Sequence, residues 1–307
     1  MENKKLEDKL LVLGGSSYIG QHLIKRLLPD EYTATYATHP FEGGYEFDCT
    51  NDRLSETVND LETYCQAILL LGDTEPNSCV LHPKRSQSIN VDGITRVIDD
   101  LVETGIRIVF VSSEFVFDGK QGEYVESDLA SPILLYGKQK LIIERYLEKC
   151  AKDFAVLRLA KVYGGEVGDG TLFTNWLPVI KQGTLDKCAS DQRFSPIFVD
   201  DVVDALLKAV ESRLQGVFHV GGPKSHSRFD CLITLLEEVQ RFRKVDLQPK
   251  PCLINDFDFP EARPVDVSMK IDKFKSEVVF CPRGIKEFCS ELAFATFGLG
   301  ATKGVSC

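Results

Sequence analysis

A chain of 307 residues, with 43% hydrophobic and 27% charged residues, has the composition of a globular protein of one large domain or two joined lobes. Its net charge of −10 argues against a surface for nucleic acid or anionic membranes, since both need clustered Lys and Arg. The charged N-terminus has no apolar signal core, and no stretch approaches the roughly 18 apolar residues of a membrane span. Scattered cysteines and histidines then predict a cytoplasmic protein that binds no metal.

Short apolar runs alternate with helical spacings of apolar residues in the first half of the chain. Strands are predicted at residues 10–13, 32–38, 45–48, 67–71, 106–111 and 154–159. Helices are predicted at residues 19–28, 86–103 and 136–150, and Pro29 ends the first of them. This alternation predicts an α/β protein of the Rossmann type, with a doubly wound parallel sheet.

The pattern loosens after residue 165, where Gly, Pro and aromatic residues become more frequent. The elements predicted there are a helix that starts in Pro196–Asp201 and runs to about Glu211, a strand at 216–220 and a helix at 229–239. We expect residues 1–165 to form mainly the parallel-sheet domain and residues 166–307 mainly a smaller C-terminal substrate lobe. Because strand patterns return in the second half, some of its segments are expected to join the first domain, so that the two are interleaved.

A glycine turn joins the first strand to the first helix, the context that a dinucleotide-binding turn requires. Gly14 permits the tight turn, Gly20 lets the helix approach the sheet, and the helix N-terminus then faces a pyrophosphate. Ser17 stands where a third glycine is usual, and an ordinary strand–helix turn is the alternative interpretation. The predicted cofactor contacts of this NAD(P)-binding domain are Gly14, Ser16, Ser17, Tyr18, Ile19 and Gly20.

The choice of cofactor depends on the residues that follow the second strand. An acidic residue there would bind the ribose hydroxyls of NAD, and none is present. Thr38 and His39 occupy the position and suit a 2′-phosphate, so the sequence favours NADP, with NAD as the alternative. Asp48, after the third strand, is predicted either to contact the adenine or to cap the segment that follows it.

Ser113 follows a buried strand, and Tyr136-x-x-x-Lys140 opens the next helix. Residues four apart share a helix face, so Lys140 is expected one turn from Tyr136, where its ammonium would lower the phenol pKa from about 10. Tyr136 could then donate a proton to a carbonyl oxygen, or remove one from an alcohol, while Ser113 holds that oxygen by a hydrogen bond. A Tyr-x-x-x-Lys pair alone is a weak signal, and a surface Tyr beside a solvated Lys is the alternative.

These motifs resemble the extended short-chain dehydrogenase/reductase family over nearly the whole chain. The greatest similarity is to dTDP-4-dehydrorhamnose reductases and to the related beta regulatory subunit of methionine adenosyltransferase. The likeness rests on Ser-Ser-Glu-Phe-Val-Phe-Asp-Gly (112–119), Tyr-Gly-Lys-Gln-Lys-Leu (136–141) and Leu-Arg-Leu-Ala-Lys-Val-Tyr-Gly (157–164). Val199-Asp-Asp201 and Arg263-Pro264 resemble signatures of the family's substrate lobe.

The resemblance implies an NAD(P)H-dependent reductase of a nucleotide-activated 4-keto-deoxysugar. Its implied catalytic residues are Ser113, Tyr136 and Lys140, of which the last two also contact the cofactor. Asn90 is an expected cofactor-site residue that would support the active-site lysine through solvent, and Leu71 and Gly72 would line the cofactor where the family usually has Asn-Ala-Ala. The expected substrate contacts are Ser113, Glu114, Phe115, Trp176 and Arg263. Plain packing is the alternative for Trp176, and a bridge between the lobes is the alternative for Arg263.

Other functions stay open because Ser17, Glu114 and the fourth-strand end depart from the family pattern. A non-catalytic NADP-binding regulatory subunit, acting through a partner enzyme, is one alternative, and a sugar-nucleotide 4-epimerase or 4,6-dehydratase is another. Phe115 stands where a dehydratase needs the second residue of an acid pair, and the acidic ribose contact usual in epimerases is missing. A nucleotide sugar is the expected partner, with a homodimer or a regulated enzyme as further candidates.

Overall fold

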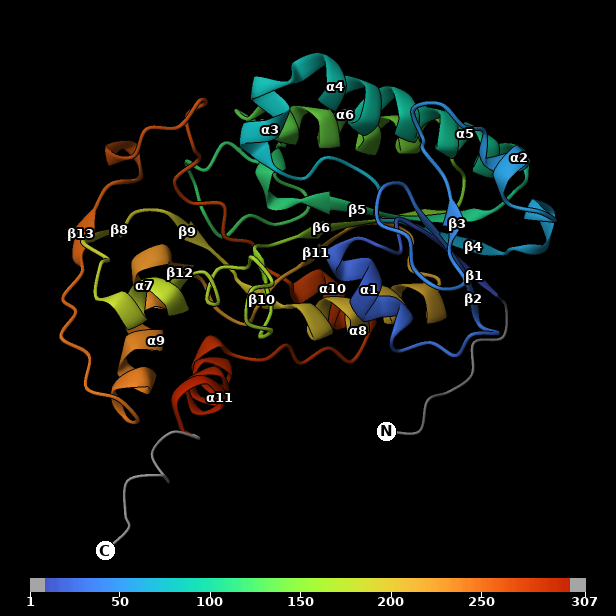
Figure 1. The fold of residues 1–307 in the computed structure, drawn as a ribbon. Coiled ribbons are helices and arrows are strands. Elements are labelled where there is room, and N and C mark those ends of the chain that lie inside the picture. The colour runs from blue at the N-terminus through green and yellow to red at the C-terminus, as the bar shows by residue number, and fades with distance from the viewer. Residues whose placement is uncertain (1–8, 299–307) are drawn as a thin grey trace, which may run out of the picture.

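The computed structural model of the protein describes residues 9–298, so the charged residues 1–8 and the tail 299–307 lie outside the described part. A seven-stranded sheet forms its centre, and all neighbouring strands in it are parallel (Figure 1). In spatial order the strands are β11 (Gly216–Val220), β6 (Phe154–Leu159), β5 (Arg107–Ser113), β4 (Gln66–Leu69), β1 (Leu10–Leu13), β2 (Tyr32–Tyr36) and β3 (Tyr45–Glu46).

Helices cover both faces of this sheet, which confirms the predicted doubly wound Rossmann-type fold (Figure 1). One face carries α1 (Tyr18–Ile24), α8 (Val199–Glu211) and α10 (Asp272–Glu277). The other carries α2 (Leu54–Thr57), α3 (Pro76–Leu81), α4 (Pro83–Gln87), α5 (Ile94–Glu103) and α6 (Leu135–Cys150). Among the helices within residues 9–298, none combines the length with the apolar character that a membrane-spanning helix requires.

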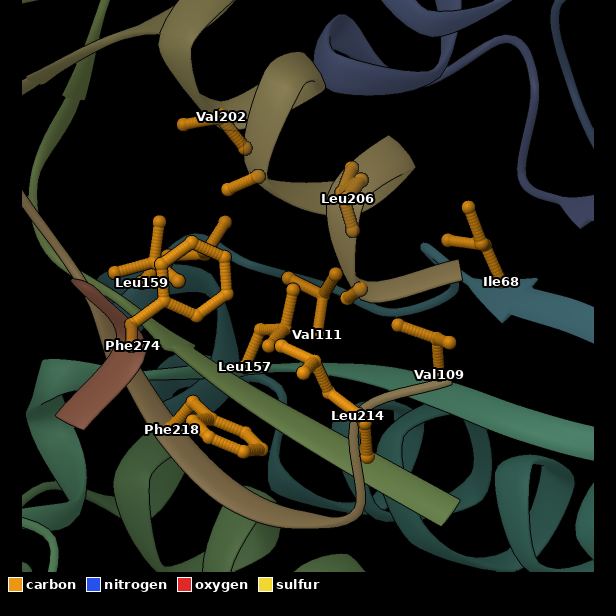
Figure 2. Packing of buried hydrophobic residues seen from close by; sticks show 14 of the residues in the cluster. Ile68, Val109, Val111, Leu157, Leu159, Val202, Leu206, Leu214, Phe218 and Phe274 are labelled. Atoms are coloured by element: carbon orange, nitrogen blue, oxygen red, sulfur yellow. The ribbon is translucent and has the colours of Figure 1, made fainter. Parts of the chain in front are cut away.

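The central strands read as continuous apolar runs because both of their faces are covered. All seven residues of β5 are buried, for example. Figure 2 shows Val111 and Leu157 of adjacent strands pointing toward Val202 and Leu206 of α8, within one buried cluster. This packing fixes the carboxyl ends of β5 and β6, and Ser113 is the last residue of β5.

A smaller lobe lies beyond the carboxyl ends of the central strands (Figure 1). Its helices are α7 (Trp176–Gln182), α9 (Arg228–Gln240) and α11 (Ile285–Phe297). Its strand pairs are β7 (Val162–Tyr163) with β10 (Ile197–Phe198), β9 (Arg193–Phe194) with β12 (His226–Ser227), and β8 (Lys187–Ala189) with β13 (Lys250–Cys252). Tyr163, Phe173 and Phe288 form an aromatic centre with ring centroids 4.7 to 5.3 Å apart. The domain boundary near residue 165 stays a prediction.

Two predicted helices differ from the observed ones in an informative way. The first ends at Ile24, five residues before Pro29, so proline is not what stops it. The helix predicted at 86–103 is a series of α4, a π-helix at Ser88–Gly93 (η2) and α5. π-Helical turns are uncommon and occur often at functional sites, and this one carries Asn90.

Candidate active site

The dinucleotide turn has the close contacts that its glycines predict. Gly14 adopts φ +92°, and a Cβ on Gly20 would lie 2.4 Å from the carbonyl oxygen of Gly14. Ser17 is the N-cap of α1, and its hydroxyl accepts a hydrogen bond from the Gly20 amide at 3.1 Å. The serine at the middle glycine position therefore stabilises the start of the helix.

Two cavities meet at the end of β4. The larger, of about 660 Å³, is lined by predicted cofactor residues Thr38, Asp48, Leu71 and Gly72. The smaller, of about 260 Å³, adjoins the glycine turn and contains the predicted residues Ser17, Tyr18, Ile19, Leu71, Ser113, Glu114, Phe115, Tyr136 and Lys140. Leu71 and Thr74 line both cavities, so one continuous wall runs from the region after β2 to the Ser–Tyr–Lys group.

The residues around the larger cavity fit the adenosine end of a dinucleotide. Thr38 lines this cavity, and its hydroxyl is 2.8 Å from Nδ1 of the exposed His39. Asp48 lines it as well, but its carboxylate also accepts hydrogen bonds from the amide and hydroxyl of Thr50. Both interpretations of Asp48 therefore stay compatible with the geometry. The glycine turn and this cavity lie at the carboxyl ends of the parallel strands, where folds of this type bind a dinucleotide.

Ser113 and Tyr136 lie in the smaller cavity, on adjacent elements. Ser113 is the last residue of β5, and its Oγ accepts a hydrogen bond from the Phe115 amide at 3.2 Å. That bond leaves the hydroxyl proton available for donation to a ligand. Tyr136, in the first turn of α6, is 6% exposed and contacts the Phe115 ring edge to face.

The pKa of Tyr136 differs from the sequence-based expectation. Burial raises this pKa well above its usual value, while the Ser113 side chain acts in the opposite direction. The expected lowering by Lys140 is thus wrong, because desolvation of the phenolate dominates. A raised pKa keeps the phenol neutral at pH 7, and the neutral phenol is the form that can donate a proton.

Lys140 lies one helical turn from Tyr136, as the spacing predicts. Its Nζ donates a hydrogen bond to the carbonyl oxygen of Val111 at 2.9 Å and lies 4.7 Å from the Phe110 ring centre. Burial lowers the pKa of Lys140 to about 8, although the Glu144 carboxylate opposes that shift. The ammonium is therefore held in a fixed place, and its charge is sensitive to pH near neutrality.

A buried ion pair connects α6, the helix that carries Tyr136 and Lys140, to strand β6. Arg158 on β6 donates to both carboxylate oxygens of Glu144, with its Nη2 2.7 Å from Oε2. The Ser112 hydroxyl donates to the same carboxylate. The hydrogen bonds from Arg158 and Ser112 to Glu144 connect α6 to β6 and β5. They also hold the Glu144 carboxylate one helical turn from Lys140.

Asn90 joins the π-helical turn to the loop after β4. Its Oδ1 accepts from the Asp73 amide at 2.7 Å, and its Nδ2 donates to Oε1 of Gln139 at 2.8 Å. A Cβ on Gly72 would lie 3.0 Å from Oδ1 of Asn90 and 3.9 Å from Nζ of Lys140. The Asn90 side chain thus lies next to Gly72, which lines the larger cavity, and close to Lys140. Its solvent-mediated support of Lys140 stays a prediction.

Glu114 is a buried carboxyl group inside the smaller cavity wall. It is 2% exposed, and its Oε2 has no hydrogen-bond partner among the described residues. Lys161, an exposed residue that lines the same cavity, attracts this carboxyl group. Desolvation nevertheless raises the pKa of Glu114 to about 8, so the carboxylic acid is largely protonated at pH 7.

The raised pKa of Glu114 predicts how stability depends on pH. A carboxyl group whose pKa rises on folding stabilises the protein at low pH, and this contribution is lost as pH rises from about 4.5 to about 8. Glu114→Gln has no carboxyl group to ionise at this position, so it does not lose stability in this way. The difference between its free energy of unfolding and that of wild type is therefore expected to increase in its favour from pH 5 to pH 8, by on the order of 4 kcal/mol. Urea unfolding at both pH values tests this, with the exposed Glu148→Gln as control. Parallel stability profiles for wild type and Glu114→Gln would contradict it.

Two predicted substrate residues lie outside both cavity linings. Trp176 is 6% exposed in the aromatic core of the lobe, with its ring next to Phe173 and the Arg228 guanidinium. Arg263 donates a hydrogen bond to Asn77 of α3, which links the lobe to the first domain. Its Nη1 is buried and has no hydrogen-bond partner within residues 9–298. Substrate binding by either residue stays a prediction.

Several cavity residues were not predicted from the sequence. They include Thr74, Glu75 and Arg85 beside the larger cavity, and Ala160, Lys161 and Val162 beside the smaller one. Lys161 lies two residues after the end of β6, so the rule that ligands bind at carboxyl ends of parallel strands could have identified it. Arg85 could not be identified by this rule, because it lies on helix α4 and not at the end of a strand. Among the described residues no cluster of three or more His, Cys, Asp or Glu is arranged to hold a metal ion.

Comparisons with known proteins agree with this geometry. The dTDP-4-dehydrorhamnose reductase of Aggregatibacter actinomycetemcomitans is 25% identical over 276 residues, which cover 87% of this chain and 92% of the relative. Methionine adenosyltransferase 2 subunit beta of Xenopus laevis is 25% identical over 248 residues, which cover 75% of this chain and 71% of that one. These similarities confirm the resemblance seen in the sequence.

The solved structure of dTDP-4-dehydrorhamnose reductase from Bacillus anthracis str. Ames, in complex with NADP, has the same fold. It covers 96% of this chain and all of its own, with a TM-score of 0.76 and 19% identity. A family model described as RmlD substrate binding domain matches residues 8–294. Because that match includes the glycine turn, the Ser–Tyr–Lys group and most of the smaller lobe, the chain belongs to the RmlD substrate binding domain family.

Proposed function

We propose that the chain is an NAD(P)H-dependent oxidoreductase that reduces the keto group of a nucleotide-activated 4-keto-deoxysugar, as its dTDP-4-dehydrorhamnose reductase relatives are named for doing. One observation carries the proposal: Ser113, Tyr136 and Lys140 share a cavity that adjoins the dinucleotide turn. NADPH, with NADH as the alternative, supplies the hydride when bound.

Three side chains position the substrate and transfer the proton. The Ser113 oxygen accepts from the Phe115 amide, and its hydroxyl donates a hydrogen bond to the keto oxygen, which holds the carbonyl in place. Tyr136 transfers its phenolic proton to the same oxygen as negative charge develops there. Lys140 is anchored by the Val111 carbonyl and stabilises the phenolate that remains.

The test is NADPH and NADH oxidation with dTDP-4-dehydrorhamnose, followed by absorbance and by mass spectrometry of the product. A product two hydrogens heavier, formed at the rate of cofactor loss, is the expected result. Tight NADPH binding without oxidation on this sugar, or on UDP-linked 4-keto sugars, would overturn the proposal.

A regulatory role is the second candidate, since the similarity to methionine adenosyltransferase 2 subunit beta covers 75% of the chain. In that case the cofactor site would serve binding alone, and the chain would act through a partner enzyme. Co-purification with a second enzyme whose activity changes on mixing, together with NADPH binding and no turnover, would favour this role. Sedimentation of the purified chain would show whether it also forms a homodimer.

A further inference from the structure

Helix α6, which carries Tyr136, begins without a local cap. Its N-cap residue is Leu134, whose side chain cannot accept a hydrogen bond from the first turn. Instead the Leu135 amide donates to both carboxylate oxygens of Glu261, at 2.9 and 3.1 Å. Glu261 lies 126 residues further along the chain, so the C-terminal half supplies the cap of the catalytic helix.

Glu261 belongs to a segment that is fixed at one end. We call residues 257–266 the strap. At its C-terminal end the Val265 carbonyl accepts from the Arg193 amide at 2.7 Å, and the Asp266 amide donates to the Gly119 carbonyl at 2.9 Å. A Cβ on Gly119 would lie 2.5 Å from Cβ of Pro264. This end of the strap is therefore anchored to the lobe and to the loop after β5.

The strap makes a second contact with the first domain. Arg263 stacks over the Phe259 ring at 4.9 Å and donates a hydrogen bond to Asn77 of α3. Glu261 and Arg263 thus reach two neighbouring helices, one of which holds Tyr136. A carboxylate at a helix N-terminus also interacts favourably with the helix dipole.

The first turn of α6 sets the distance between the two hydroxyl groups of the site. It packs so closely on the main chain after Ser113 that a Cβ on Gly137 would lie 1.9 Å from the Phe115 carbonyl oxygen. Phe115 also donates its amide to Ser113. A small displacement of this turn would therefore move Tyr136 relative to Ser113.

We propose that Glu261 is a positioning residue: by capping α6 from the strap, it holds Tyr136 at the distance from Ser113 that proton transfer needs. The role rests on the proposed reductase function. It makes the catalytic geometry depend on the strap, so that the lobe contributes to the chemical step as well as to substrate binding.

The experiment compares Glu261→Ala with Glu261→Gln, whose amide oxygen can still accept the Leu135 hydrogen bond. Exposed Glu148→Ala, on the same helix and away from the cavity, is the control. With NADPH and dTDP-4-dehydrorhamnose, Glu261→Ala is expected to lower kcat about tenfold, the size of a lost cap expressed as a rate. KM and the NADPH Kd stay within about twofold, Glu261→Gln regains most of the rate, and Glu148→Ala matches wild type.

Three results would overturn the inference. The first is a kcat for Glu261→Ala equal to that of the control, and the second is a rise in KM with kcat unchanged, which would make Glu261 a substrate contact. The third is a failure of Glu261→Gln to regain the rate, since the hydrogen bond would then not be the cause.

Hydrogen exchange separates this inference from the proposed function. Hydrogen exchange of the backbone amides in the first turn of α6 can be measured without substrate. We expect this exchange to be faster in Glu261→Ala than in wild type, and unchanged in Glu261→Gln and Glu148→Ala. If wild type shows no turnover while this pattern appears, the reductase function fails but the cap is real. Unchanged exchange in Glu261→Ala overturns the inference whether or not wild type is active.

Discussion

Replacing Tyr136 with Phe is expected to lower kcat by about a hundredfold or more, within the range of about 10² to 10⁴ for loss of a general acid. The ring keeps its contact with Phe115 and its place 5.9 Å from Nζ of Lys140, so packing changes little. Only the acidic hydroxyl is lost from the cavity. Steady-state oxidation of NADPH with dTDP-4-dehydrorhamnose measures the loss, and calorimetry is expected to show NADPH binding within about threefold of wild type.

A second tyrosine on the same helix provides the control. Tyr146 donates its hydroxyl to Asp99, away from both cavities, so Tyr146→Phe removes the same atom from another place. Its kcat is expected to match wild type. Equal activity of Tyr136→Phe and Tyr146→Phe would remove Tyr136 from the reaction, because another group would then have to supply the proton.

The parts of the site that were predictable are those encoded by local sequence. In the glycine turn, Gly14 has a positive φ, and Gly20 packs against the carbonyl oxygen of Gly14. Both positions require glycine, so a short sequence motif is enough to predict them. The Tyr136–Lys140 spacing likewise follows from helix geometry. Ser113 was placed by its position after a buried strand, because strand ends in parallel sheets converge on the ligand side.

Residues brought in by distant segments could not be predicted in the same way. Glu261 caps α6 across 126 positions, and no local pattern marks it. The π-helical turn at Asn90 cannot be recognised from a 3.6-residue period, and the hydrogen bonds that join Asn90 to Asp73 and Gln139 are tertiary contacts. Tertiary contacts decide such features, and a single sequence does not report them.

Electrostatics was the least predictable property of the site. A motif shows that Lys140 lies beside Tyr136, but it does not show how deeply either group is buried. Burial raises the pKa of Tyr136 and lowers that of Lys140 to about 8. Proximity alone predicted a lowered tyrosine pKa, so the sign depended on desolvation, which only the fold determines.

The strongest electrostatic prediction follows from Lys140. Lys140→Met keeps the length of the side chain but removes the ammonium, which leaves the Val111 carbonyl unpaired and the phenolate unsupported. We expect kcat to fall about a hundredfold and NADPH to bind about tenfold more weakly, as for loss of charged hydrogen bonds. Exposed Lys138→Met, two residues away on the same helix, removes an ammonium from solvent and is expected to behave as wild type.

The same residue predicts the alkaline limb of the pH profile. The Lys140 pKa of about 8 means that its ammonium is present below that pH and is lost as pH rises through it. Wild-type kcat/KM is therefore expected to decline above about pH 8, because the charged form supports proton transfer from Tyr136. Lys140→Met has no proton to lose, so its low activity should lack this limb, whereas Lys138→Met should keep it. A limb that persists in Lys140→Met would show that another group controls the reaction at high pH, and Glu114, with its pKa of about 8 in the same cavity, would be the residue to test.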